Sequence, residues 1–474
     1  MRCFKKAAAL VFAILLAVLF ACANPDVPST DTPAPSPSAD SHPASSSIVD
    51  TTSPSTPDGE LTICIDESTY SVMKPIFDKF IDTLPGVDIG YEILPQRDPD
   101  TYTQMQQRIN TEIMGGSGPD LFILHSGYYT RGTPNLNCFF TDINKVMRSG
   151  IFTDLSPLFV DGSLSKDDFV PVLDVGAVDG KQFVMPLMYQ VSGIVTNADS
   201  YIKFGLGDFA DTGAMLNAIA TATTAANSGA WSASSSSNIY ELISPYFFSN
   251  LVDYSNETES VGSDITRQVL SSAKTAYQNV EDRRIFENNT NISDSYLEYA
   301  NSGDFLVFAT NFVDIVGEAA VAQHAGATPH IRILRADGGG VRAVITMFAA
   351  VRSGSGMEDA AKALVAYLLS TESQTSFNPQ MGPQWWDGFP MRKGLVEQRV
   401  NLVTGRNFQV GQAFPRLSIE NAQALIDVEN QVASACFPVP LEVTDMIAFF
   451  YRGDSSIDEC IRQMQSYWQQ SLTE

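Results

Sequence analysis

The sequence predicts an α/β protein of two lobes. The chain has 474 residues, which is more than one ordinary hydrophobic core organises, so two lobes are expected. Its folded part begins with strand and helix signals that alternate between residues 61 and 124. Apolar residues make up 44% of the chain and aromatic residues 10%, a composition that suits a packed protein rather than a disordered one.

The alternation of strands and helices is read from the spacing of apolar residues. Leu61–Asp66 is an apolar run and predicts a strand, and residues 72–81 repeat apolar side chains every four positions, which predicts a helix. Residues 87–93 alternate apolar and polar side chains and predict a second strand. A second helix is predicted over 105–113, and Leu121–Leu124 predicts a third, buried strand. This order is typical of a parallel sheet with helices on its faces.

Polar side chains follow the first and third of these strands. Glu67, Ser68 and Tyr70 come after the first strand, and His125 and Ser126 come after the third. Ligands of open α/β sheets bind beyond the carboxyl ends of the strands, so these five are candidate ligand-binding residues. Each also has a plain structural alternative. Ser68 is suited to cap the following helix, and His125 and Ser126 to form an ordinary loop.

The second half of the chain adds helices before it returns to strands. The region 204–298 is mostly polar and has a helical pattern, and the rest alternates between apolar runs and amphipathic stretches. The predicted elements are, in order, helices over 215–226, 239–248 and 265–280, strands over 305–309, 331–334 and 344–351, and helices over 357–369 and 457–468.

A short segment near residue 190 predicts a passage between the two lobes. Apolar runs on both sides of it predict short strands, the first over Phe183–Met185 and the second over Ile194–Thr196. Pro186 lacks a backbone N–H and fits badly inside a central strand, so it is expected to end the first run. The segment between the runs is then an extended strap that borders both lobes. It carries Tyr189 and Gln190, and we expect these two side chains to line a cleft.

The charge of the chain excludes two classes of partner. Lys and Arg number 29 and Asp and Glu number 54, which gives a net charge of −25. Nucleic acids and anionic membrane surfaces both require a basic protein face. We therefore expect no nucleic-acid partner, and we expect the acidic side chains to form a solvated surface.

The first residues have the features of an export signal. Basic side chains precede Ala7–Phe20, an unbroken apolar run that is short for a membrane span. The tetrapeptide Leu19–Cys22 resembles a bacterial lipobox. That resemblance implies a signal peptide over 1–21 and a lipid on Cys22, the first residue of the mature chain. Plain secretion is the alternative, because Phe20 is bulkier than the residue usual at that position.

The segment after the predicted anchor has the composition of a linker. Residues 22–58 are rich in Pro, Ser, Thr and Asp and almost free of apolar side chains, so they cannot bury a core. We expect a disordered, lipid-anchored leash on the outer face of the cell membrane. No later run is long and apolar enough to span a bilayer. The lipid is therefore the only membrane contact that the sequence predicts.

Four cysteines remain in the predicted folded part, and they form no metal motif. No two have C-x-x-C spacing, and no His lies near enough for a zinc pattern. We expect neither a metal nor a cofactor. Cys436 and Cys460 are candidates for a disulfide outside the cell, and buried free thiols are the alternative for these two and for Cys64 and Cys138.

The sequence contains none of the common catalytic motifs. H-E-x-x-H, G-x-S-x-G, a Walker loop and a G-x-G-x-x-G that follows a strand are all absent from it. Asp and Glu are abundant, but no pair of them is singled out for glycoside cleavage. The sequence therefore favours a binding protein over an enzyme.

Six segments match, in order, the segments of a known family. They are Gly116–Ile123, Phe152–Leu158, Gly180–Asp199, Asn301–Phe308, Ala360–Gln374 and Phe389–Arg392. Together with the lipobox and the leash, they resemble bacterial extracellular solute-binding proteins of family 1, the sugar-binding type. The resemblance covers residues 59–474 and fades over 200–300.

The resemblance implies the two-lobed α/β fold of type II periplasmic-binding proteins, with three crossings between the lobes. Lobe one is predicted over 59–186 and 309–335, and lobe two over 191–305 and 341–474. The implied function is capture of a small solute, an oligosaccharide or a related polar molecule, and its delivery to the membrane permease of an ABC importer. The predicted crossings are the strap, Val307–Asn311 and Ala336–Ala343.

Sugar-binding sites combine aromatic faces with polar side chains, and a few further residues meet that description. Trp385, Trp386 and Asp387 lie together in a loop flanked by glycines and are candidates for the cleft. Their alternative is that one Trp packs in the core, because adjacent side chains of an extended segment face opposite ways. Asn311 and Arg342, near the second and third crossings, are weaker candidates. Arg342 is also suited to a surface ion pair.

Two other functions remain as alternatives at this point. One is a lipid-anchored glycoside hydrolase of the cell surface, which would need a fixed acid–base pair and would turn its ligand over. The other is a sensor or adhesion lipoprotein that binds a partner protein. The poor match over 200–300 leaves the solute unnamed, because that region is expected to supply half of the cleft.

Overall fold

The structure is a computed structural model of the whole chain, which divides into one unit of residues 1–55 and another of 56–474. The predicted signal peptide, Cys22 and the leash over 22–58 lie outside the described residues. The residues described are 59–127, 138–197, 202–203, 205–206, 209, 212–222, 243–244, 247–281, 306–309, 312–324, 327–335, 340–376, 388–404 and 417–473.

The first five elements confirm the predicted alternation of strands and helices. They are β1 (Gly59–Asp66), α2 (Glu67–Ile81), β2 (Val87–Leu94), α3 (Pro99–Met114) and β3 (Leu121–His125). β1 pairs in parallel with both β2 and β3. The apolar stripe predicted for α2 is buried, because its apolar side chains recur on one face of the helix.

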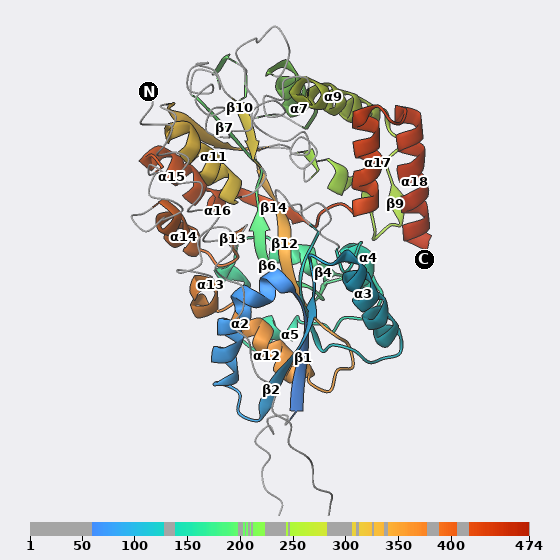
Figure 1. Cartoon of the computed structure of the whole chain (residues 1–474), viewed down its shortest axis with the longest axis vertical. Helices are drawn as coiled ribbons and strands as arrows, with labels where there is room; N and C mark the ends of the chain where they lie inside the picture. Colours follow the sequence, from blue (N-terminus) through green and yellow to red (C-terminus); the bar gives the residue numbers. More distant parts are fainter. Residues whose placement is uncertain are drawn as a thin grey trace, which may run out of the picture. The chain divides into compact units, whose positions relative to one another are not determined.

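Four strands from later in the chain complete this sheet. The order is β13-β6-β12-β3-β1-β2, and β14 pairs with the free part of β12. β12 is long and central: every one of its residues is buried except Arg342. Its second half lies antiparallel to β3, and its first half lies parallel to β14 (Figure 1). The four strands are β6 (Met185–Gln190), β12 (Val341–Val351), β13 (Phe389–Pro390) and β14 (Val432–Cys436).

The prediction that Pro186 ends a strand is wrong. Pro186 lies inside β6, which is fully buried and pairs with β12. The register of that pairing shifts on both sides of Met347, next to the partner of Pro186. On the other side of β6, β13 pairs with Met188 and Tyr189 and does not reach Pro186. A proline at such an irregular, one-sided position removes no regular ladder bond, which is why the strand tolerates it.

A second sheet has the order β10-β7-β11 and is antiparallel throughout. Its strands are β7 (Gly193–Asn197), β10 (Leu306–Ala309) and β11 (Pro329–Ile333). Successive side chains of a strand face opposite ways, and β7 therefore contributes to two cores. Val195 joins the large core of the first sheet, and Ile194 joins a second core.

The second core is built mainly by helices. It contains the stripe predicted for the last helix, in which Cys460, Ile461, Met464 and Trp468 are all buried. α17 and α18 are neighbouring helices in Figure 1. The helices of this core are α7 (Thr212–Ala222), α9 (Asp264–Glu281), α17 (Leu441–Arg452) and α18 (Ile457–Thr473).

Helices and short elements complete the described part of the chain. The longer of them pack on the first core, and several short ones add buried residues to one core or the other. They are α4 (Ile143–Arg148), α5 (Pro157–Val160), η1 (Lys166–Asp168), η2 (Leu173–Gly176), β4 (Ala177–Val178), β5 (Lys181–Gln182), η3 (Phe248–Asn250), β8 (Val252–Asp253), β9 (Thr258–Glu259), α11 (Phe312–His324), α12 (Glu358–Leu368), α13 (Thr371–Ser376), α14 (Leu395–Thr404), α15 (Ile419–Ile426) and α16 (Val428–Gln431).

The pairing of strands favours lobe boundaries that differ from the predicted ones. The second sheet joins residues 193–197 to 329–333, which the sequence prediction placed in different lobes. β12 shares a sheet with β1–β3, although its residues were placed in lobe two. The lobe boundaries stay a proposal. We propose to assign the second sheet to lobe two and β12 to lobe one, because hydrogen-bonded strands move together.

The glycine-rich segment Gly116–Ile123, one of the family-like segments, has a structural role at the start of β3. Gly116 and Gly118 adopt positive φ angles of 78° and 98°, which favour glycine. The chain thereby turns so that Asp120, 8% exposed, points into the protein. The Asp120 carboxylate accepts hydrogen bonds from the Thr62 backbone N–H at 2.9 Å and the Ser355 hydroxyl at 2.6 Å, and it pairs with Arg352 at 3.4 Å.

In the described part of the chain the cysteines form no disulfide. Cys64, Cys138, Cys436 and Cys460 are reduced thiols, so the alternative of buried or partly buried thiols holds. In the described part of the chain, no helix has the length and apolar character needed to cross a membrane.

Candidate functional site

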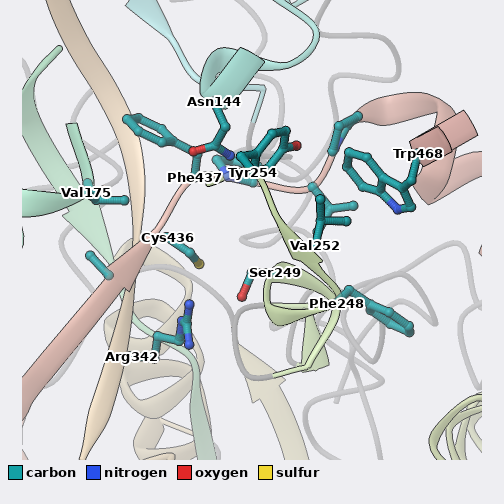
Figure 2. A pocket seen from close by; sticks show the side chains of 14 residues that line it. Asn144, Val175, Phe248, Ser249, Val252, Tyr254, Arg342, Cys436, Phe437 and Trp468 are labelled. Atoms are coloured by element: carbon teal, nitrogen blue, oxygen red, sulfur yellow. The ribbon is translucent and has the colours of Figure 1, made fainter. Parts of the chain in front are cut away.

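A pocket of about 170 Å³ lies between the first sheet, which supplies Arg342 and Cys436, and the second core, which supplies Phe248 and Trp468 (Figure 2). Its walls come from segments that are far apart in the sequence, which is the arrangement expected of a cleft between lobes. Fourteen described residues line it: Asn144, Val175, Phe248, Ser249, Val252, Tyr254, Arg342, Ala435, Cys436, Phe437, Pro438, Val439, Pro440 and Trp468.

One end of the pocket is polar. Figure 2 shows the guanidinium of Arg342, from β12, pointing toward the side chains of Cys436 and Ser249. Burial raises the pKa of the Cys436 thiol, and the positive charge of Arg342 opposes that rise. The thiol therefore stays protonated, and it lines the pocket as a small neutral group beside the charged guanidinium.

The other side of the pocket is aromatic. Tyr254 and Trp468 meet edge to face, with ring centroids 6.1 Å apart. Trp468 is 3% exposed, and its Nε1 atom has no hydrogen-bond partner among the described residues. This N–H is itself fully buried, so it is the ring of Trp468 and not its N–H that we place in the site. Aromatic rings and a guanidinium are among the groups that recognise a sugar.

A polar contact joins the two sides of the pocket next to Asn144. Asp142, which is 7% exposed, precedes α4 and caps it by accepting a hydrogen bond from the Lys145 backbone N–H. Its other carboxylate oxygen accepts from the Tyr254 hydroxyl at 2.8 Å and from the Ser471 hydroxyl at 3.2 Å. Burial and then the Asp142 charge raise the pKa of Tyr254, so this phenol remains a donor. Asp142 thus holds α4 to a turn after β8 and to α18.

Tyr254→Phe tests this contact. The variant keeps the ring that packs on Trp468 and removes the hydroxyl that reaches Asp142. A hydrogen bond to a charged group contributes about 1.5–3 kcal/mol, so the unliganded protein should open more readily. We expect a larger radius of gyration in small-angle X-ray scattering. Tyr91→Phe, which removes a half-buried hydroxyl elsewhere, is the control. Equal radii for all three proteins would show that the contact does not hold the lobes together.

The predicted residues at the strand ends lie at the expected edge of the first sheet, but they do not line the described pocket. Glu67, Ser68 and Tyr70 lie in the first turn of α2, whose N-cap is Asp66, so Ser68 does not cap the helix. Tyr70 packs edge to face on Tyr91.

His125 and Ser126 are held by the backbone of the first sheet. The backbone N–H of His125 donates to the Asp66 carboxylate at 2.8 Å, and the Ser126 hydroxyl donates to the carbonyl of Ile345. Burial raises the pKa of Asp66, an effect that His125 opposes. Asp66 is therefore a buried carboxylate at the predicted ligand edge that the sequence analysis did not single out.

Tyr189 and Gln190 lie in the first core and not on an exposed strap. Tyr189 is 0% exposed, and its ring stacks on Phe389 with centroids 5.3 Å apart. Gln190 is also 0% exposed, and its Oε1 accepts from the backbone N–H of Phe312 at 2.8 Å. Gln190 thereby ties the first predicted crossing to the start of α11, directly after the second. A role of these residues in ligand binding stays a prediction.

Five predicted ligand-binding residues remain, of which one lines the pocket and four are not described by the structure. Arg342 lines the pocket. Asn311, Trp385, Trp386 and Asp387 lie outside the described residues. The lining residues that sequence reasoning missed include Tyr254 and Ser249, which lie where the family resemblance fades. Trp468 carried a signal, because it lies in the apolar stripe of the last helix, but that stripe predicts a core position.

The comparison with protein families decides the class of the protein. A family model described as bacterial extracellular solute-binding protein matches residues 66–375, more than half of the chain. The chain belongs to this family. It is thus a member of a family of extracellular solute-binding proteins. No curated protein sequence matches the chain.

Solved structures confirm the fold class. The chain resembles the sugar-binding protein MalE from Xanthomonas citri with a TM-score of 0.57 at 14% identity, covering 88% of this chain and 98% of that one. A family 1 extracellular solute-binding protein from Bifidobacterium longum subsp. infantis gives a TM-score of 0.55 at 14% identity and 87% and 99% coverage. The GacH receptor of Streptomyces glaucescens gives 0.51 at 15% identity, with 87% and 98% covered. The fold is the two-lobed type II periplasmic-binding-protein fold with three interlobe crossings.

Proposed function

We propose that this protein captures a saccharide in the described pocket and delivers it to the permease of an ABC transporter. The observation that carries the proposal is the lining of the pocket. The aromatic side chains of Tyr254 and Trp468 and the guanidinium of Arg342 line one space. The pocket is smaller than the roughly 300–1,000 Å³ of sites for drug-sized ligands, so it suits one sugar ring of a longer chain.

The proposed capture uses closure of the lobes. Lining residues come from α4 and η2 on one side and from η3, β8 and α18 on the other, so a ligand that contacts both sides favours the closed form. The Asp142–Tyr254 contact adds to closure at the same place. A permease that recognises the closed form would then receive the solute. MalE and the GacH receptor support a saccharide, since the first is described as sugar-binding and the second was solved with acarbose.

The proposed location is the outer face of the cell membrane, with a lipid on Cys22. The lipobox-like Leu19–Cys22 and the composition of residues 22–58 support this proposal. The membership of an extracellular family agrees with export of the chain.

The lining favours a binding protein over the hydrolase. A glycoside hydrolase places two carboxyl groups about 5–9.5 Å apart around the scissile bond. The described lining consists of Arg, Asn, Ser, Cys and apolar side chains, a set that binds and orients a sugar. We therefore keep the hydrolase as an outcome of the experiment and not as a second proposal.

The experiment is a titration of the full-length protein, kept in detergent, against a panel of mono- and oligosaccharides. Tryptophan fluorescence reports binding, since Trp468 lines the pocket, and chromatography of the sugar after incubation reports turnover. We expect a saturable signal with the sugar recovered intact. Cleaved sugar would establish the hydrolase. No response to any saccharide would defeat the proposal and favour the partner-binding alternative.

A further inference from the structure

We propose, building on the proposed function, that the pocket selects an acidic saccharide, and that Arg342 pairs with the carboxylate of a uronic acid residue. The polar end of the pocket then binds the carboxylate of the sugar. The aromatic end, formed by Tyr254 and Trp468, packs against the sugar ring.

The charge of the pocket is opposite to the charge of the protein. Acidic residues outnumber basic ones by 54 to 29 over the whole chain. Among the fourteen described lining residues, however, the one charged side chain is Arg342, and the others are neutral. A guanidinium in a partly enclosed site interacts strongly with an anion, because the local dielectric constant is lower than that of water. The lining itself thus carries one positive charge, at the end opposite the Asp142–Tyr254 contact.

The backbone directs Arg342 into this space. All ten other residues of β12 are buried, and Arg342 alone is half-buried. The pairing of β12 with β14 shifts register between Val341 and Arg342, where Ala433 of β14 has no partner, so Arg342 lies beside an irregular part of the ladder. Figure 2 shows the result, with the guanidinium turned toward the side of the pocket that holds Ser249 and Cys436.

The chemistry of the neighbours favours a carboxylate. Arg presents parallel N–H donors that match a carboxylate in a bidentate pair. Cys436 lies beside the guanidinium, and the thiol remains protonated because burial raises its pKa. A neutral thiol is a weak acceptor. A ligand carboxylate is a stronger acceptor for the guanidinium than this thiol, and the polar side chains of Ser249 and Asn144 line the same pocket.

The net charge decides how this preference is measured. A charge of −25 repels an anion at long range, so salt raises the rate of encounter while it weakens the local pair. Salt dependence therefore mixes two opposite effects. An acidic sugar and its neutral methyl ester differ in the carboxylate and share the ring, so the ratio of their affinities reports the local pair.

The test is calorimetry of the full-length protein with disaccharides of glucuronic, galacturonic and mannuronic acid, each paired with its methyl ester. A hydrogen bond to a charged group is worth enough for a preference of about tenfold or more. We expect at least one acid to bind that much more tightly than its ester. Arg342→Gln should remove the preference, and Arg342→Lys should keep part of it. Arg452→Gln, which removes an exposed charge from the end of α17, should keep all of it.

The outcomes separate this inference from the proposed function. Saturable binding of neutral sugars, with acids no tighter than esters, overturns the acidic-saccharide inference and leaves the proposed function standing. Tight binding of a sugar phosphate but of no uronate also overturns it. So does a preference that survives in an Arg342→Gln protein whose thermal unfolding matches the parent. Binding of no saccharide, acidic or neutral, overturns both.

Discussion

Tyr189→Ala should lower the free energy of unfolding by about 3–5 kcal/mol, the usual cost of removing a buried aromatic ring. The ring is fully buried in the first core, and it stacks on Phe389, which in turn meets Phe312 edge to face. Its removal leaves a cavity between β6, β13 and the start of α11. Urea unfolding followed by circular dichroism measures the loss.

Tyr189→Phe is the matched control. The Tyr189 hydroxyl is buried and has no hydrogen-bond partner among the described residues, and burial raises its pKa. Removing an unpartnered hydroxyl should leave the stability unchanged or raise it. The sequence prediction leads to the reverse pattern for Tyr189→Ala, a fall in affinity with little change in stability. That pattern, measured well below the unfolding temperature, would place Tyr189 in the cleft after all.

Asp120→Asn should also cost about 3–5 kcal/mol, because it breaks a buried ion pair and leaves one charge behind. Arg352 is 8% exposed and donates from Nε to the carbonyl of Pro119 at 3.0 Å. The amide that replaces the carboxylate points an N–H₂ group at either Arg352 or the Thr62 N–H, both of which are donors. The junction of β1, β3 and β12 should therefore loosen.

Asp78→Asn is the control for Asp120→Asn. It removes a carboxylate from an exposed pair with Lys74 on α2, and such pairs contribute about 0–1 kcal/mol. Both variants are compared in the same urea titration. Equal, small losses would mean that the Asp120 network does not stabilise the first sheet. A large loss in the free energy of unfolding for Asp120→Asn, with saccharide affinity retained at low temperature, would show that Asp120 stabilises the fold and does not take part in binding.

The motifs that made the family recognisable belong to the scaffold. Asp120 of the glycine-rich segment links three strands, as described above. Gln374, 4% exposed, donates to the carbonyl of Leu187 in β6 and accepts from the backbone N–H of Met391. Arg392 donates to the carbonyl of Leu369 at 2.7 Å. These side chains satisfy buried backbone groups, so they mark the fold and carry no information about the solute.

The candidate site was much less accessible to sequence reasoning. Arg342 was singled out because it lies near a predicted crossing, and it lines the pocket. Tyr254 and Trp468 were missed, since one lies in a region without a recognisable pattern and the other in an apolar helical stripe. Periodicity shows that a face is buried, but it does not show whether the face meets a core or a ligand.

The sequence by itself determined the βαβαβ start, the α/β class and the family, because local periodicity and short backbone-bonding motifs decide them. Only the tertiary structure decided that Pro186 lies within a strand and that Tyr189 is a core residue. Only it brought Arg342 within one pocket of Tyr254 and Trp468. The reason is that these features depend on contacts between segments far apart in the chain, which no local pattern encodes. Such contacts set the register of β12 with its neighbours, the lateral order of the strands, and the packing of α18 on a distant turn.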